Sequence, residues 1–136
     1  MNIELTTKEF RRLLDLVYIG NWILNSTRGE NDRIEDYDKV QEKLFSLCGQ
    51  NGMKALIETW RGHIYPSRAY EDGGIHEAIA DYEDAVFFDI LAEELARRDM
   101  DFEHVNPDDI NELTTRMGEY ISEFERNGVD NITIEP

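Results

Sequence analysis

The segment between Arg61 and Tyr70 holds the side chains of this 136-residue chain that are best suited to binding a ligand. It combines two arginines, a histidine, a serine and two tyrosines, the kinds of polar group that converge in small-molecule sites. Arginines bind carboxylates and phosphates through pairs of parallel hydrogen bonds. We therefore consider a small-ligand site, or a hydrolase active site, in this segment. Its candidate residues are Arg61, His63, Tyr65, Ser67, Arg68 and Tyr70.

The same segment also suits a purely structural role, which we favour. Many long connections only join elements of a fold, and no known motif accompanies this one. In a structural segment, the arginines pair with carboxylates or cap helix ends, and Tyr65 and Tyr70 pack against the core. In a ligand site, Arg61, His63 and Arg68 instead converge on one concavity.

A second candidate is a metal site at the start of a helix predicted over residues 75–98. Glu77, Asp81 and Asp84 are spaced by four and three positions, which places their carboxylates on one face of a helix, and His76 adjoins them. A mixed set of carboxylate and imidazole ligands suits a transition metal. The alternative, which we favour, is the solvated face that any amphipathic helix has.

No catalytic motif supports either site. The chain has no glycine-rich phosphate loop, no paired cysteines, no His-Glu-x-x-His sequence and no nucleophile elbow. A second histidine, such as His63 or His104, would be needed to favour the metal. The single cysteine, Cys48, has no basic neighbour in the sequence to stabilise a thiolate, so we expect it to be buried and unreactive. We expect no cofactor, and a binding protein rather than an enzyme.

Helices must position these residues, and the first has the clearest start. Thr6 and Glu9 match a capping box, and Leu5 and Phe10 occupy the positions of a hydrophobic staple. Apolar residues then cover more than half of the helix circumference, which is typical of a helix at the centre of a bundle or in a dimer interface. Besides the main stripe, a second stripe is formed by Leu16, Ile19 and Ile23.

Four further helices are predicted from periodic apolar residues and from caps, over residues 33–48, 53–60, 75–98 and 106–127. The helix over 53–60 is short. The stripe predicted to face inward on the 33–48 helix comprises Ile34, Tyr37, Val40, Leu44 and Leu47.

The fold class that follows is mainly α. We predict a single helical domain over residues 1–136, a bundle of four main helices and one short helix. Ile3 and Leu5 alternate with polar residues, as do Ile132 and Ile134. A small two-stranded ribbon formed by the two chain termini is therefore included in the prediction.

The net charge of −16 lies entirely in the second half of the chain. Residues 1–68 carry ten basic and ten acidic side chains, whereas residues 69–136 carry four and twenty. This asymmetry attracts cationic partners and disfavours nucleic acid and anionic membranes. We therefore expect a protein partner, with a basic one suited to the charge, and no direct binding of nucleic acid or membrane. The two-sided apolar pattern of the first and third long helices also predicts a homodimer.

The sequence favours a soluble, cytoplasmic protein. Its first residues are acidic and have no apolar stretch behind them, so we expect no secretory signal. No apolar tract is long enough to span a bilayer. A lone cysteine fits a reducing compartment.

Two functional hypotheses follow, and the sequence alone does not decide between them. The leading one is a small acidic, non-catalytic interaction or regulatory protein. The alternative is a small-ligand-binding protein or hydrolase that uses the segment from Arg61 to Tyr70, with a metal near His76. An enclosed pocket that joins loop and helix would favour the alternative, and an open acidic face would favour the interaction protein.

Overall fold

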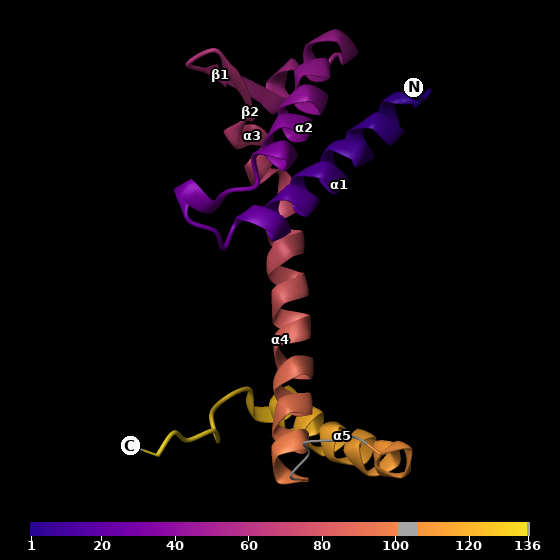
Figure 1. Cartoon of the computed structure of the whole chain (residues 1–136), viewed down its shortest axis with the longest axis vertical. Helices are drawn as coiled ribbons and strands as arrows, with labels where there is room; N and C mark the ends of the chain where they lie inside the picture. Colours follow the sequence, from indigo (N-terminus) through magenta and orange to yellow (C-terminus); the bar gives the residue numbers. More distant parts are fainter. Residues whose placement is uncertain (101–105, 136) are drawn as a thin grey trace. The chain divides into compact units, whose positions relative to one another are not determined.

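The computed structural model describes residues 1–100 and 106–135 of the chain (Figure 1). It divides into two compact units, Met1–Ile79 and Ala80–Pro136, which we call unit 1 and unit 2. Most of the described residues are helical, and a small antiparallel sheet accompanies the helices. The predicted mainly α fold is therefore confirmed. The single domain depends on how the two units associate and stays a prediction. No helix in the described residues is long and apolar enough to cross a membrane.

Unit 1 begins with helix α1, Thr7–Asn25, whose start is fixed by the predicted capping box. The Glu9 amide donates a hydrogen bond to the Thr6 hydroxyl at 3.1 Å, and the Thr6 amide donates to the Glu9 carboxylate at 3.0 Å. These bonds satisfy two amides near the helix start, where intrahelical partners are missing. The helix therefore begins where the sequence indicates.

Helix α1 buries one of its two apolar stripes. Leu14 is fully buried, and Phe10 and Tyr18 lie beside it on the same face. The second stripe is only partly covered: Ile19 packs against the core, whereas Leu16 is 70% exposed and Ile23 is 57% exposed. The described part of unit 1 therefore leaves part of an apolar face of α1 uncovered.

A buried asparagine connects the end of α1 to helix α2, Glu35–Phe45. The Asn25 side chain accepts from the Ile34 amide at 2.8 Å and donates to the Ile34 carbonyl at 3.2 Å. It also donates to the Asn21 side chain at 2.6 Å. The Asn25 side chain thus provides hydrogen-bond partners for backbone groups just after the 3-10 turn Glu30–Asp32.

The inward face of α2 differs from the predicted stripe. Of the predicted stripe, Leu44 packs against the core, but Tyr37, Val40 and Leu47 are exposed. Phe45 and Cys48 are fully buried instead, which confirms the predicted burial of the cysteine. The helix is therefore rotated relative to the prediction.

Polar residues on the inward face explain this difference. Asn21 of α1 donates to Asp38 at 3.0 Å and to Gln41 at 3.1 Å, so two polar side chains of α2 face α1. Because part of the contact is polar, the apolar period indicates the wrong face of this helix.

A β-hairpin follows α2 and two 3-10 turns, Ser46–Asn51 and Lys54–Leu56. Strand β1, Ile57–Trp60, pairs with β2, His63–Pro66, in antiparallel register. The two residues of the turn, Arg61 and Gly62, have φ of 51° and 79°. Positive φ at both positions is the geometry of tight hairpin turns that match the strand twist.

The hairpin corrects two predictions. The short helix over 53–60 is wrong: only Lys54–Leu56 is helical, as a 3-10 turn, and Trp60 belongs to strand β1, where it is 58% exposed. The two-stranded ribbon exists, but it does not come from the chain termini, because residues 1–6 and 132–135 form no strand. A two-residue turn brings β1 and β2 together locally, and the chain ends have no such connection.

The main core of unit 1 forms around Tyr70, which is 1% exposed. Its ring packs edge-on against Tyr18 and Phe45, with centroid distances of 5.2 and 5.1 Å. Edge-to-face pairs of this kind are favourable arrangements of aromatic rings. The core therefore joins α1 and α2 to the segment after the hairpin.

That segment runs into the longest helix. It comprises the short helix α3, Arg68–Tyr70, a π-helical turn, Glu71–Ile75, and then helix α4, His76–Asp99. Gly74 has a φ of 110°, which L side chains rarely adopt, so the chain changes direction there. On α4, Ile79 is buried, whereas Tyr82 and Ile90, which lie at helical spacing from it, are 62% and 58% exposed.

Unit 2 contains the rest of α4 and helix α5, Ile110–Asn127, which is preceded by a 3-10 turn, Pro107–Asp109. The rings of Phe88 and Phe124 pack at 5.3 Å between these two helices. Near the end of α4, the Tyr120 hydroxyl donates to the Asp99 carboxylate. Apolar and polar contacts thus both join α4 to α5.

Candidate functional site

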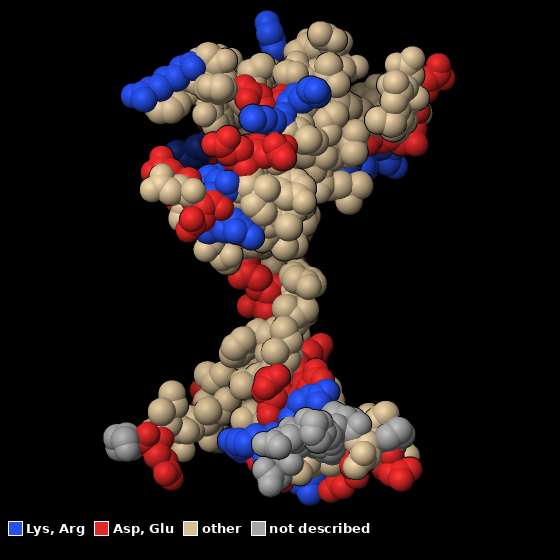
Figure 2. Space-filling view, viewed as in Figure 1, with Lys and Arg blue, Asp and Glu red and all other residues tan. Residues whose placement is uncertain are grey.

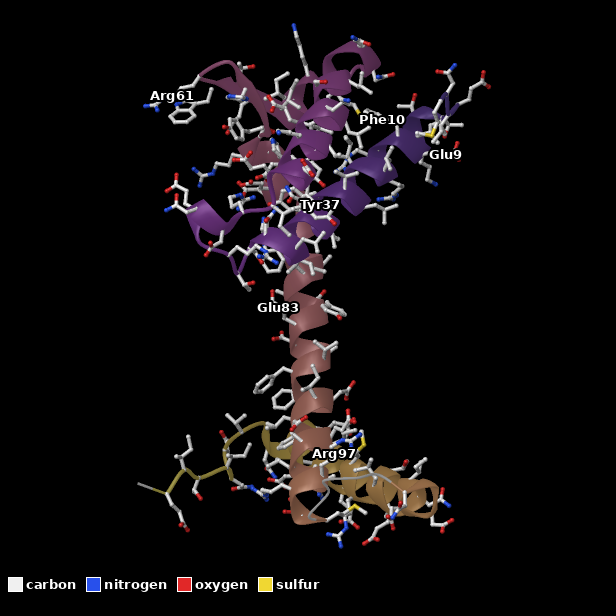
Figure 3. All side chains as sticks on the ribbon, in the orientation of Figure 1. Glu9, Phe10, Tyr37, Arg61, Glu83 and Arg97 are labelled. Carbon is white, nitrogen blue, oxygen red and sulfur yellow. The ribbon has the colours of Figure 1, made fainter. Side chains whose placement is uncertain are left out.

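Two arginines of the candidate segment have partners within the fold. The Arg61 guanidinium stacks over the Trp60 ring at 4.2 Å, at the tip of the hairpin (Figure 3). The Arg68 guanidinium lies 3.4 Å from the Asp72 carboxylate, and both side chains are strongly exposed. A cation over a ring and a surface ion pair are weak contacts that stabilise local geometry. The two guanidinium groups line none of the pockets described below.

Ser67 and Tyr70 lie inside the fold of unit 1. The Ser67 hydroxyl donates to the Ala55 carbonyl at 2.6 Å and accepts from the Tyr70 amide at 3.2 Å, so it caps α3. The Tyr70 hydroxyl donates to the Asp15 carboxylate at 2.8 Å. Burial, and next the hydrogen bond to Asp15, raise the pKa of Tyr70 above its ordinary value. Both side chains are therefore engaged in structural contacts.

The other two candidates, His63 and Tyr65, line a cleft of about 550 Å³ between α2 and β2. Glu42 of α2 holds the hairpin there: it accepts from the Ile64 amide at 2.9 Å and lies 3.2 Å from His63 Nδ1. The Ile64 amide, and next His63, lower the pKa of Glu42. The structure thus joins two of the six candidate residues to a carboxylate that the sequence did not single out.

The charges in this cleft are mixed. Arg33 donates to both oxygens of Asp38, at 2.9 and 2.7 Å, so its fork is already occupied. Lys39 also lines the cleft and makes no ion pair among the described residues. The cleft therefore offers an ammonium, an imidazole and a phenol, groups that hold small polar ligands.

The proposed metal ligands make other contacts or none. His76 Nε2 forms a hydrogen bond of 2.6 Å with the Tyr18 hydroxyl, and burial and Glu71 raise the pKa of Tyr18 to about 12. Glu77, Asp81 and Asp84 are exposed on α4. Within the described residues, no group of three His, Cys, Asp or Glu side chains is arranged to hold a metal ion.

The second histidine considered for this site gives no further support. His63 pairs with Glu42 on the hairpin, and His104 lies outside the described residues. The metal site thus has no assembled ligand set among the residues that the structure describes.

Unit 2 carries a groove of about 400 Å³ between α4 and α5, which sequence reasoning did not identify. Its floor is apolar, with Phe124 95% buried and with Ile121 and Phe88 half-buried. Its rim is acidic. The carboxylates at the groove belong to Asp84, Asp89 and Glu125, which we call the rim acids.

The rim acids make no hydrogen bond or ion pair with the residues that the structure describes, whereas the arginines of unit 2 are engaged. Arg97 pairs with Glu93 at 2.7 Å, and Arg116 pairs with Glu112 at 3.0 Å. The guanidinium of Arg98 pairs with the adjacent Asp99, and Arg126 donates to a backbone carbonyl. The groove therefore combines an apolar floor with unneutralised negative charge.

The sequence contained part of this signal. Phe88 and the acids on both sides of it lie on the predicted helix over 75–98, and Phe124 lies on the predicted helix over 106–127. The sequence did not show that the two helices pack together along these faces. Periodicity indicates which face of a helix is apolar, but not which element covers that face.

No protein-family description, no curated protein and no solved structure matches this chain at a significant level. The functional proposals therefore rest on the geometry and charge of these sites.

Proposed function

We propose that this chain is a non-catalytic interaction protein and that unit 2 binds a basic protein partner. One observation carries the proposal: unit 2 has seventeen acidic and four basic side chains, and its arginines are occupied within the unit. Unit 1 has thirteen acidic and ten basic side chains, so most of the net charge of −16 belongs to unit 2. Such a field steers cationic partners toward one unit.

The surface of unit 1 is different. Figure 2 shows basic and acidic atoms interspersed over the face of unit 1 that is in view. Mixed charge of this kind favours solubility without selecting a partner by sign. We therefore assign the recognition of a basic partner to unit 2.

Capture experiments with charge-neutralised variants test this proposal. The immobilised protein is incubated with extract of its source cells, and captured proteins are identified and released by salt. The test variant replaces six acids of unit 2 by their amides: Glu83, Asp84, Asp89, Glu94, Glu119 and Glu125. The control variant replaces six exposed acids of unit 1 in the same way: Glu4, Glu30, Asp32, Glu35, Asp36 and Glu58.

We expect wild type and the unit 1 control to retain the same basic proteins, and the unit 2 variant to lose them. Added salt should release them, because it screens exposed charges. Circular dichroism confirms that both variants fold. Retention of the same proteins by the unit 2 variant would contradict the proposal, as would a captured set that is not basic.

The cleft between α2 and β2 supports a second candidate, a small-ligand site. The observation is that His63 and Tyr65 share a cleft of about 550 Å³ with Lys39. A library of small anionic compounds, screened by NMR, tests it. We expect His63→Ala to abolish any binding and Arg61→Ala, at the hairpin tip outside this cleft, to preserve it. Equal loss in both variants would exclude the cleft as the site.

A further inference from the structure

We propose that the groove between α4 and α5 binds an amphipathic helix of a partner protein. The helix places an apolar face in the groove and directs Lys or Arg side chains to the rim acids. This inference rests on the proposed function, because it gives the basic partner a shape and a binding site on unit 2.

The apolar floor requires an apolar occupant. Phe88 and Ile121 are only half-buried, and Phe124 lies beneath them. The described part of unit 2 buries few other apolar residues: Ala92, Ala96 and Leu113. Two packed helices expose a furrow along their contact, and a third helix fits it by placing its side-chain ridge between theirs. A helix in the groove would therefore extend a small core.

The rim sets the charge of the occupant. Asp84 and Asp89 come from α4 and Glu125 comes from α5, so carboxylates flank the floor on both helices. No Lys or Arg lines the groove. An occupant with basic residues on the flanks of an apolar stripe pairs with these charges, whereas a neutral or acidic one leaves them repelling each other.

The same charges argue against a second copy of this chain as the occupant. Each copy carries a net charge of −16, and three of its carboxylates lie at the groove of unit 2, where an approaching copy would meet them. Like charges brought together at an interface oppose association. A foreign basic helix meets no such opposition.

Defined peptides test the inference. The probes are helical peptides of about 18 residues, or about five turns. Each has Lys and Arg on one face and an apolar stripe on the other. One position in the stripe varies between peptides and holds Leu, Met, Phe or Trp. A polar peptide of the same charge, with Ser and Gln in the stripe, is the control probe. We expect at least one amphipathic peptide to bind about tenfold more tightly than the polar one, because it buries a large apolar side chain that the polar peptide lacks.

Two pairs of variants locate the binding. Ala85 is exposed at the groove, so Ala85→Arg fills it with a cation, whereas Ala80→Arg makes the same change on α4 outside it. We expect the first to abolish peptide binding and the second to weaken it less than about threefold. For charge, the rim variant is Asp84→Asn, Asp89→Asn and Glu125→Gln, and its matched control is Glu83→Gln, Glu94→Gln and Glu119→Gln.

The rim variant should weaken binding about tenfold and its control much less, since each exposed ion pair contributes little and three of them are lost together. In NMR spectra of the wild-type protein, shifts induced by the peptide should concentrate at Ala85, Phe88 and Ile121.

The outcomes separate this inference from the proposed function. If both charge variants weaken binding equally and Ala85→Arg has no effect, the groove is excluded, and a diffuse acidic surface still supports the proposed function. If no peptide binds more tightly than the polar control, the amphipathic occupant is excluded. If sedimentation shows that Ala85→Arg dissociates the protein itself while no peptide binds, a second copy occupies the groove and the inference is wrong. If the charge variants change no binding at all, the proposed function fails as well.

Discussion

Single side chains supply missing backbone partners at several points of unit 1. The Thr6 hydroxyl caps α1, and the Ser67 hydroxyl caps α3. The Asn25 side chain forms hydrogen bonds with both the backbone N–H and the backbone carbonyl of Ile34. Each of these groups replaces a backbone hydrogen bond that regular structure does not provide. Side chains of this type therefore determine where the elements begin and how they connect.

Replacement of Thr6 by Ala should lower the free energy of unfolding by about 1 kcal/mol, because the Glu9 amide loses its acceptor. Chemical denaturation measures the change. Thr7→Ala, one residue further on and also exposed, is the control and should have little effect. Equal midpoints for wild type and Thr6→Ala would mean that the cap does not stabilise α1.

Single residues also show why the contacts of the candidate segment could not be predicted from the sequence. The types of Ser67 and Tyr70 suggested ligand contacts, but their roles depend on neighbours outside the candidate segment. Tyr70 meets Asp15 fifty-five residues away, and Ser67 meets Ala55. Residue type indicates what a side chain is able to do, and only the fold determines which partner it finds.

At the scale of elements, the hairpin depends on its two-residue turn. Gly62 has a φ of 79°, and no atom lies within 4 Å of the Cβ that an alanine would add. Gly62→Ala should therefore destabilise the protein through backbone strain alone, by roughly 1–2 kcal/mol. Thermal unfolding measures this change. Gly49→Ala is the control, because Gly49 has equal space and no positive φ. A similar loss in both variants would show that the positive φ of Gly62 is not its cause.

The sequence predicted α1 and approximately α4 and α5, because each has a cap or a long apolar period. It missed the hairpin, because Arg61 is not a residue that signals a tight turn, although β-branched and aromatic residues stand on both sides of Gly62. It misplaced the face of α2, because Asp38 faces inward on that helix. Sequence signals thus predicted helices well where neighbouring residues cap the helix or form a long apolar period. They were less reliable where two helices meet through polar side chains.

The contact between α1 and α2 should weaken in acid. Hydrogen bonds from Arg33, and then from Asn21, lower the pKa of Asp38 below its ordinary value of 3.8, although desolvation opposes them. A depressed pKa in the folded state stabilises the fold above the unfolded pKa, and this stabilisation is lost as pH falls through the folded pKa. Asp38→Asn should therefore flatten the loss of stability below about pH 4.

Denaturation curves of the wild type and of Asp38→Asn at a series of pH values test this dependence. Asp36→Asn is the matched control, since Asp36 is exposed on the same helix and makes no ion pair among the described residues. If both variants keep the acid slope of the wild type, the Arg33–Asp38 pair does not contribute to it.

At the scale of the whole molecule, charge and apolar surface have opposite effects on self-association. The net charge of −16 repels a second copy, whereas the partly exposed second stripe of α1 favours one. Two large aromatic residues of the helices predicted to form a homodimer are engaged within the fold, because Trp22 packs against the core of unit 1 and Phe88 packs on Phe124. The exposed Leu16 and Ile23 of α1 are therefore the better candidates for a dimer interface.

We therefore expect a dimer at micromolar concentration whose stability rises with salt, because salt screens the repulsion between two acidic chains but leaves apolar burial intact. Light scattering across a series of salt concentrations measures the mass. Leu16→Gln, on the 70% exposed position, should shift the protein to monomer, whereas Val40→Gln, on an exposed position of α2, should not. A mass that stays monomeric at high salt would exclude the dimer. A dimer that salt dissociates would instead indicate an interface held by ion pairs, such as basic residues of one copy on the acidic unit 2 of another.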